Sequence, residues 1–342
     1  MKRAEPTLKD SVPVPYVTIV PTWESQQMWR EKGKSWNWPM MCGGLALALL
    51  DERIGLDVNP STEMSEEWLR GQKVIALSGA SGISVEEAKR LSAWVRSGGG
   101  LLATYDSGLY DEKGQLRHDG GALRDILGVK MKGQLASQPE CCYRVTEGHA
   151  ALGEYAAGTA VEGDGRIIPV EAVGGARMIA ECWNLGTGEV RGPAIVVNSY
   201  GRGRTVYVSG SLEANYLFDR VESNGRLLRS MVEYLGGGAP QAFKLQAPRG
   251  VYGVLRQAMS GDLVLWLLAN VGFKDAAAGL MRQEFVPASN VEVGIRVPEG
   301  RQPKGVRLMR AGHSLPHRLE TGYATATIPS LHIAEAVHLE LA

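Results

Sequence analysis

The turn after one apolar segment carries a serine and an aspartate, two residue types that serve in hydrolytic chemistry. Residues 101–104 form a short apolar run typical of a buried strand, and Tyr105-Asp106-Ser107-Gly108 follows directly. A serine hydroxyl becomes a nucleophile when an oriented histidine accepts its proton. The nearest histidine, His118, lies in the polar stretch DEKGQLRHDGG, and no ordered acid partner accompanies it. We therefore assign no catalytic residue. Asp106 and Ser107 are the candidates if this turn has any activity, and we expect Asp106 to stabilise the turn.

Tryptophans gather in one segment near the start of the chain. Four of the eight, Trp23, Trp29, Trp36 and Trp38, follow the first expected strand, residues 16–20. We interpret this segment as a loop at the carboxyl edge of a parallel sheet, where ligands bind. Indole rings suit both sugar faces and subunit interfaces. The four side chains are thus expected to contact a substrate or a partner subunit, and packing onto their own domain is the alternative.

The remaining motifs favour structural roles. Gly79-Ala80-Ser81-Gly82 precedes a helix and could hold an anion, but it lacks both GxGxxG and GxxxxGK[ST], so we expect a plain turn and no nucleotide cofactor. The acidic pairs at 66–67 and 86–87 fall on helical stretches, where capping or solvation explains them.

The four cysteines contain no CxxC motif and have no histidine at ligand spacing. They are Cys42, Cys141, Cys142 and Cys182. We therefore expect reduced thiols, a cytoplasmic protein and no bound metal. The histidines of the last hundred residues are irregularly spaced, which also argues against a metal site.

The composition is that of an ordinary globular protein. The 342 residues include 37 basic and 37 acidic side chains, so net charge gives no reason to expect nucleic acid or an anionic membrane as a partner. The longest apolar runs, 42–50 and 263–269, fall short of the ~20 residues of a membrane span. The amino-terminal residues lack the apolar region of a secretory signal.

The order of expected elements divides the chain. Strands near 16–20, 73–77 and 101–104 alternate with helices near 40–53 and 84–96, which predicts an open parallel α/β sheet covered on both faces. A hairpin near 194–208 and a helix near 223–235 follow. Short strands then fill the rest, which is typical of a small all-β sandwich. The predicted division is a polar tail at 1–12, an α/β domain at 13–238 and a β-sandwich at 239–342.

These segments resemble a known family. Residues 74–77, 84–96, 98–104 and 123–129, followed by 200–207 and 248–270, are similar to the C-terminal part of family 42 β-galactosidases and related glycosidases. The resemblance implies a flavodoxin-like, class I glutamine-amidotransferase-like trimerisation domain followed by a C-terminal β domain. In such a fold a nucleophile sits on the turn equivalent to 105–108, where this sequence has no cysteine.

In these enzymes a catalytic (β/α)8 barrel with both catalytic glutamates precedes the two domains. A barrel needs ~250 residues, and about a dozen precede the first expected strand here, so we expect this chain to lack it. The resemblance then implies a non-catalytic assembly module, a homo-oligomer with a trimer favoured, whose partner is a separate catalytic barrel subunit. The alternatives are a stand-alone hydrolase of glycosidase or esterase type using Asp106 and Ser107, and a carbohydrate-binding module using the tryptophans.

Overall fold

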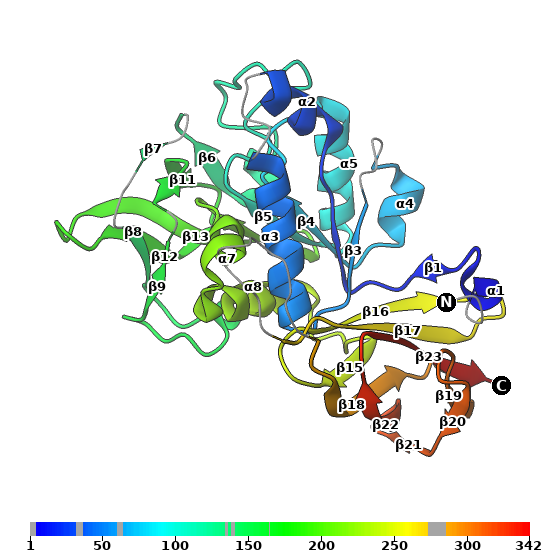
Figure 1. The fold of residues 1–342 in the computed structure, drawn as a ribbon. Coiled ribbons are helices and arrows are strands. Elements are labelled where there is room, and N and C mark those ends of the chain that lie inside the picture. Colours follow the sequence, from blue (N-terminus) through cyan, green and yellow to red (C-terminus); the bar gives the residue numbers. More distant parts are fainter. Residues whose placement is uncertain are drawn as a thin grey trace. The chain divides into compact units, whose positions relative to one another are not determined.

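The computed structural model describes residues 5–31, 37–59, 64–133, 136–137, 141–163, 165–272 and 285–342. The chain divides into two compact units (Figure 1). The α/β unit comprises Val17–Glu52 and Val58–Ala239, and the β unit comprises Met1–Tyr16, Arg53–Asp57 and Pro240–Ala342. Within the described residues, strands outnumber helices.

The α/β unit is built on a nine-stranded sheet of order β3-β2-β4-β5-β14-β13-β12-β8-β9. Its strands are β2 (Val17–Ile19), β3 (Leu56–Val58), β4 (Val74–Ser78), β5 (Gly100–Thr104), β8 (Cys141–Val145), β9 (Ala160–Glu162), β12 (Arg177–Asn184), β13 (Val190–Tyr200) and β14 (Gly203–Val208). Strands β2, β4, β5 and β14 pair in parallel, whereas β14 to β9 pair antiparallel. Every residue of β4 and β5 is buried, as in strands covered on both faces.

Helices α3, α7 and α8 contact one another, and α4 contacts α5. Their bounds are α2 (Trp23–Glu31), α3 (Asn37–Asp51), α4 (Glu66–Arg70), α5 (Val85–Arg96), α6 (Arg124–Leu127), α7 (Leu212–Asp219) and α8 (Glu222–Leu235). The cap predicted for α5 is present, because Ser84 Oγ accepts from the Glu87 amide while Glu87 bonds back to the Ser84 amide.

Short elements complete the α/β unit. Strands β6 (Val129–Met131) and β11 (Val170–Ala172) form one antiparallel pair, and β7 (Ala136–Ser137) and β10 (Arg166–Ile167) form another. A 3-10 turn, η1, spans Ala150–Leu152.

The β unit contains a six-stranded and a four-stranded sheet, of orders β1-β16-β17-β23-β19-β20 and β15-β18-β22-β21. Their strands are β1 (Val12–Pro13), β15 (Phe243–Gln246), β16 (Val251–Gln257), β17 (Leu263–Ala269), β18 (Ala288–Arg296), β19 (Pro303–Leu308), β20 (His313–Leu315), β21 (His317–Glu320), β22 (Tyr323–Leu331) and β23 (Ala334–Leu341). One apolar cluster combines side chains of both sheets, such as Leu265 and Val293. This is the core of a sandwich.

Two segments differ from the expected organisation. Part of the expected polar tail, Glu5–Leu8, is helix α1. Strand β1 pairs antiparallel with β16, because main-chain hydrogen bonding to a sheet edge orders even a polar segment. The tryptophan segment, expected to be a loop, contains helix α2 and the start of α3.

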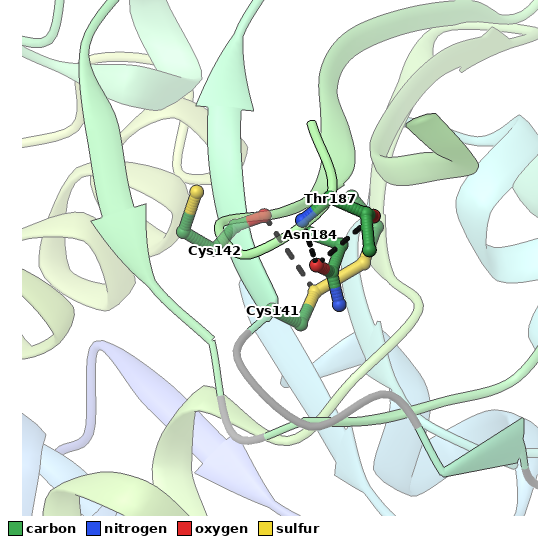
Figure 2. The surroundings of a disulfide bond; sticks show 5 residues. Cys141, Cys142, Asn184 and Thr187 are labelled. Carbon is green, nitrogen blue, oxygen red and sulfur yellow. Dashed lines mark hydrogen bonds between the residues drawn. A yellow bond between two sulfur atoms is a disulfide. The ribbon is translucent and has the colours of Figure 1, made fainter. Parts of the chain in front are cut away.

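The prediction of four reduced thiols is wrong for two of them. Cys141 and Cys182 form a disulfide, whose sulfurs Figure 2 shows joined. The antiparallel register of β8 and β12 sets Cys141 opposite Asn184, two residues from Cys182, so both cysteines share one face of the sheet. The neighbouring Cys142 points away from the disulfide and is a buried free thiol, as is Cys42.

In the described part of the chain, no helix is long and apolar enough to cross a membrane.

Candidate functional site at the carboxyl edge of the parallel strands

The sharp turn after β5 is centred on Tyr105. Its φ is +57°, in the left-handed region that costs a non-glycine residue free energy. Two main-chain contacts hold this geometry: the Tyr105 amide donates to Val208 O at 2.8 Å, and the Tyr207 hydroxyl donates to Tyr105 O at 2.6 Å. Both tyrosine side chains are buried. The strained position therefore presents an interior phenol ring, without a thiol or a serine hydroxyl.

Ser107 lies two residues further on and is fully buried. Its Oγ lies 2.7 Å from Thr104 O and 2.9 Å from Leu77 O, and it accepts from the Ala80 amide at 3.1 Å. Among the described residues, no hydrogen bond links Ser107 to a histidine, and His118 is exposed. These contacts join the ends of β4 and β5 and engage the Ser107 hydroxyl with main-chain groups.

Asp106 is 2% exposed and belongs to a buried chain of hydrogen bonds. Trp29 Nε1 donates to Ser81 Oγ at 2.9 Å, and Ser81 Oγ donates to Asp106 Oδ1 at 2.7 Å. The chain connects α2, the turn after β4 and the turn after β5. Burial, reinforced by the Asp106 carboxylate, raises the pKa of the Tyr110 phenol, so the ring beside it stays neutral.

The four predicted tryptophans do not form one surface. Trp29 is buried in the core of the α/β unit and meets Tyr110 edge-on, with ring centroids 6.4 Å apart. Trp23, at the first position of α2, is 52% exposed. Trp38 belongs to the first turn of α3, and Trp36 lies outside the described residues. Of the two with described side chains, only Trp23 is available to an external partner.

A buried acid that the sequence reading missed lies at the same edge. Glu213, in the first turn of α7, is fully buried, and its Oε1 accepts from Ser78 Oγ at 2.7 Å and from Thr104 Oγ1. Ser78 and Thr104 are the last residues of β4 and β5. The signal for Glu213 in the sequence was an acidic residue shortly after the strand that pairs with β5. Its hydrogen-bond partners, Ser78 and Thr104, lie more than a hundred residues earlier in the chain.

The surroundings of Glu213 keep a nearby thiol protonated. Burial raises the pKa of the Cys42 thiol to about 12, and the Glu213 carboxyl adds to this shift. The Cys42 Sγ lies 3.6 Å from Ser78 O. Within the described residues, no group of three or more histidine, cysteine or acidic side chains could hold a metal ion. The polar groups of this edge therefore bond mainly to one another, which stabilises the junction of strands and helices.

A cleft of about 760 Å³ lies elsewhere on the α/β unit, along α5. Neither Asp106 nor Ser107 lines it. This cleft is thus separate from the turn that carries the predicted catalytic candidates.

Comparison with known proteins shows the family. Residues 48–225 match the family described as the β-galactosidase trimerisation domain. A β-galactosidase from Geobacillus sp. (strain Y412MC61) is 28% identical over 186 residues, which cover 54% of this chain and 24% of that enzyme. The chain thus matches about a quarter of the length of that relative.

Two solved structures share the fold over the whole chain. The α-L-fucosidase isoenzyme 2 from Paenibacillus thiaminolyticus has a TM-score of 0.72 at 17% identity. The likeness covers 100% of this chain and 51% of the fucosidase chain. The β-galactosidase from Bacillus circulans sp. alkalophilus has a TM-score of 0.68 at 18% identity and covers 99% of this chain and 43% of its own. Together with the matched residues, these likenesses agree with the resemblance to the C-terminal part of family 42 β-galactosidases. The chain belongs to the β-galactosidase trimerisation domain family.

Proposed function

We propose that this chain is a non-catalytic assembly module whose α/β unit self-associates, with a trimer as the favoured state. The observation that carries the proposal is the match of residues 48–225 to a family described by trimerisation. The turn after β5 adds to it. Tyr105 occupies the strained position there, and Ser107 is buried against main-chain groups, so the turn is suited to holding strands together.

The fold assigned to the α/β unit is part of the proposal. The order β3-β2-β4-β5-β14 follows the 2-1-3-4-5 pattern of flavodoxin-like sheets when these strands are numbered along the chain. We assign the unit to this class, in its glutamine-amidotransferase-like form. The antiparallel strands β13, β12, β8 and β9 extend the sheet beyond β14.

The proposed partner in assembly is a catalytic barrel of the β-galactosidase type. The matched relative carries that activity in its name, and the chain covers about a quarter of it. In this arrangement the glycosidic chemistry belongs to the barrel, and the present chain holds copies of it in a defined array.

Light scattering coupled to size-exclusion chromatography tests the proposal on the purified chain. We expect a particle of three times the 36.9 kDa chain mass at tens of micromolar. A stable oligomer of this kind buries about 1,200–2,000 Å² at each interface, so it should survive dilution into the low micromolar range. A strictly monomeric chain would contradict the proposal.

An activity screen distinguishes the hydrolase alternative. Aryl galactosides and aryl esters are incubated with the wild-type chain, Ser107→Ala and Asp106→Ala. We expect no turnover that depends on either side chain, because both are buried and hydrogen-bonded. Turnover abolished by Ser107→Ala would restore the hydrolase reading.

A further inference from the structure

The cleft along α5 is lined by aliphatic and cationic side chains. Its aliphatic lining includes Ala88 and Ala122, together with the exposed Val85 and Ala93. Five lining residues are basic and two are acidic: Lys89, Arg96, Arg117, Arg124 and Arg202 against Asp119 and Asp125. Lys89 also pairs with Glu86 at 2.7 Å, which leaves the four arginines as the main source of positive charge. Lys89 and Arg96 are seven residues apart on α5, so their Cα atoms lie about 10 Å apart along one helix face. The cleft therefore matches an elongated occupant with more than one negative charge.

Several of these cations are already positioned. Arg96 Nη2 donates to the Tyr200 hydroxyl at 2.8 Å, and its guanidinium lies 5.1 Å from the centre of that ring. Arg202 Nη2 donates to Ser97 O at 2.9 Å. Each arginine keeps further N–H groups after these bonds, because a guanidinium has five. Little side-chain freedom remains to be lost when an anion binds.

The lining points to a polypeptide occupant. None of the cleft residues is aromatic, so sugar rings and nucleobases would find no stacking surface there. Arginine is instead enriched at protein interfaces, whereas lysine is depleted there. Four of the five cations are arginines. The best match is a peptide segment with an apolar anchor and carboxylates.

Charge decides how two copies of the chain would meet here. A two-fold interface would set the cationic cleft against itself, and like charges repel. A cyclic trimer instead joins two different patches of each protomer. Because the whole chain has equal numbers of basic and acidic residues, a surplus of cations in the cleft leaves a surplus of carboxylates elsewhere.

The end of α7 has the required features. Phe218 is 64% exposed, and the adjacent Asp219 is exposed and forms no ion pair among the described residues. The carboxyl end of a helix also carries partial negative charge. The following Arg220 is paired with Asp51, so its charge is already compensated.

The other large exposed apolar side chains of the α/β unit lack such a neighbour. Trp23 adjoins Glu24, whose Oε2 is buried, and Val190 adjoins Glu189, which pairs with Arg191. Val85 belongs to the cleft itself. Leu185 has no acidic residue directly beside it, and the acid before Val58, Asp57, is half-buried.

We propose that the cleft along α5 binds the Phe218–Asp219 turn of a second copy of this chain, and that repetition of this contact closes the trimer. The inference rests on the proposed assembly function and names the two surfaces that carry it. Phe218 would pack against the aliphatic side chains of the cleft, while Asp219 would pair with its arginines. An aromatic anchor beside a charged pair is a common source of interface affinity.

Complementation between two variants tests the contact. The cleft variant carries Arg124→Glu and Arg202→Glu, and the turn variant carries Phe218→Ser and Asp219→Lys. All four positions are exposed, so we expect unchanged far-UV circular dichroism. Each variant alone should dissociate at concentrations at which the wild type is still trimeric, because the dissociation constant is raised about tenfold or more. Their equimolar mixture should form a dimer, because one intact cleft then meets one intact turn.

The controls separate this inference from the assembly proposal. Lys113→Glu with Lys304→Glu reverses two exposed charges outside the cleft and should leave the trimer intact. A trimeric wild type whose cleft or turn variant is also trimeric would overturn the inference alone, as would a mixture that stays monomeric. A monomeric wild type would overturn the assembly proposal. If the double variants unfold, the single variant Arg124→Gln replaces them. A trimer that dissociates more readily than the wild type at low salt supports the contact, and unchanged dissociation refutes it.

Discussion

Two neighbouring glycines of α3 test how closely this helix packs against α7, which carries Glu213. A Cβ atom added at Gly44 would lie 1.9 Å from the main-chain oxygen of Glu213 and 2.7 Å from its carbonyl carbon. A Cβ added at Gly43 would meet nothing within 4 Å. Both residues lie inside the same helix, so Gly43→Ala is a matched control for Gly44→Ala.

The two substitutions should have opposite signs. Alanine favours a helix interior over glycine by about 0.5–1 kcal/mol, and Gly43→Ala should gain that amount. Gly44→Ala gains the same propensity but must push the α7 backbone away, since a main-chain oxygen cannot rotate aside as a side chain does. Overpacking costs about 1–3 kcal/mol where side chains can adjust. We therefore expect Gly44→Ala to lower the free energy of unfolding by about 1 kcal/mol or more.

Thermal unfolding followed by far-UV circular dichroism measures the difference. For a unit of this size about 1 kcal/mol corresponds to a Tm shift of about 2–4 °C. Gly43→Ala should raise the Tm and Gly44→Ala should lower it. Equal stabilisation by both changes would refute the close approach of α3 to α7, and with it the account of how Glu213 is held beneath the strand ends.

Three further predictions concern buried or half-buried polar side chains. Ser107→Ala should lower the free energy of unfolding by about 1–3 kcal/mol, because main-chain groups lose a buried hydrogen-bond partner. Urea denaturation measures this loss, and an unchanged free energy would mean that the hydroxyl is solvated. Burial raises the pKa of Glu24, so ionisation of this carboxyl at pH 7 destabilises the folded state. Glu24→Gln should therefore raise the Tm at pH 7 but not below the ordinary carboxyl pKa, and a Tm difference that is independent of pH would contradict this. Burial, assisted by Arg177, lowers the pKa of His149, whose Nδ1 accepts a main-chain hydrogen bond. The free energy of unfolding should therefore fall as the pH drops below 6.5, and this loss should be smaller in His149→Asn. If the exposed-site control His118→Asn reduced the loss by the same amount, the assignment to His149 would be refuted.

Local features of this fold could be predicted from the sequence. Helix α5 begins after Ser84 and ends at Arg96, as the capping box and the glycines at 98–100 predict. Strands β13 and β14 form the hairpin predicted near 194–208, with its turn at 201–202. These features depend on hydrogen bonds and conformational preferences of residues close together in the chain. Such information is present in any short window of sequence.

Features that depend on distant pairing were not predictable in the same way. The disulfide joins residues 41 apart in sequence, and only the register of β8 and β12 brings them together. The sequence did not predict helix α2, because its mostly polar composition weakens the apolar period and its buried apolar residues, Met28 and Trp29, are adjacent in sequence. The role of Glu213 depends on where β4 and β5 end relative to α7.

The turn after β5 shows the structural role of the residues predicted as catalytic candidates. A left-handed tyrosine costs about 1–3 kcal/mol and persists only where its surroundings fix it. Here the hydroxyl of Tyr207 and the carbonyl of Val208 hold Tyr105, and the turn in turn directs Asp106 towards Ser81 and α2. With Glu213 joining the same strand ends to α7, this edge is a junction of internal elements, filled by the protein's own side chains. The described polar groups of this edge are bonded to one another, whereas the outer face of α5 has both charge and a cleft, which is why the proposed partner is placed there.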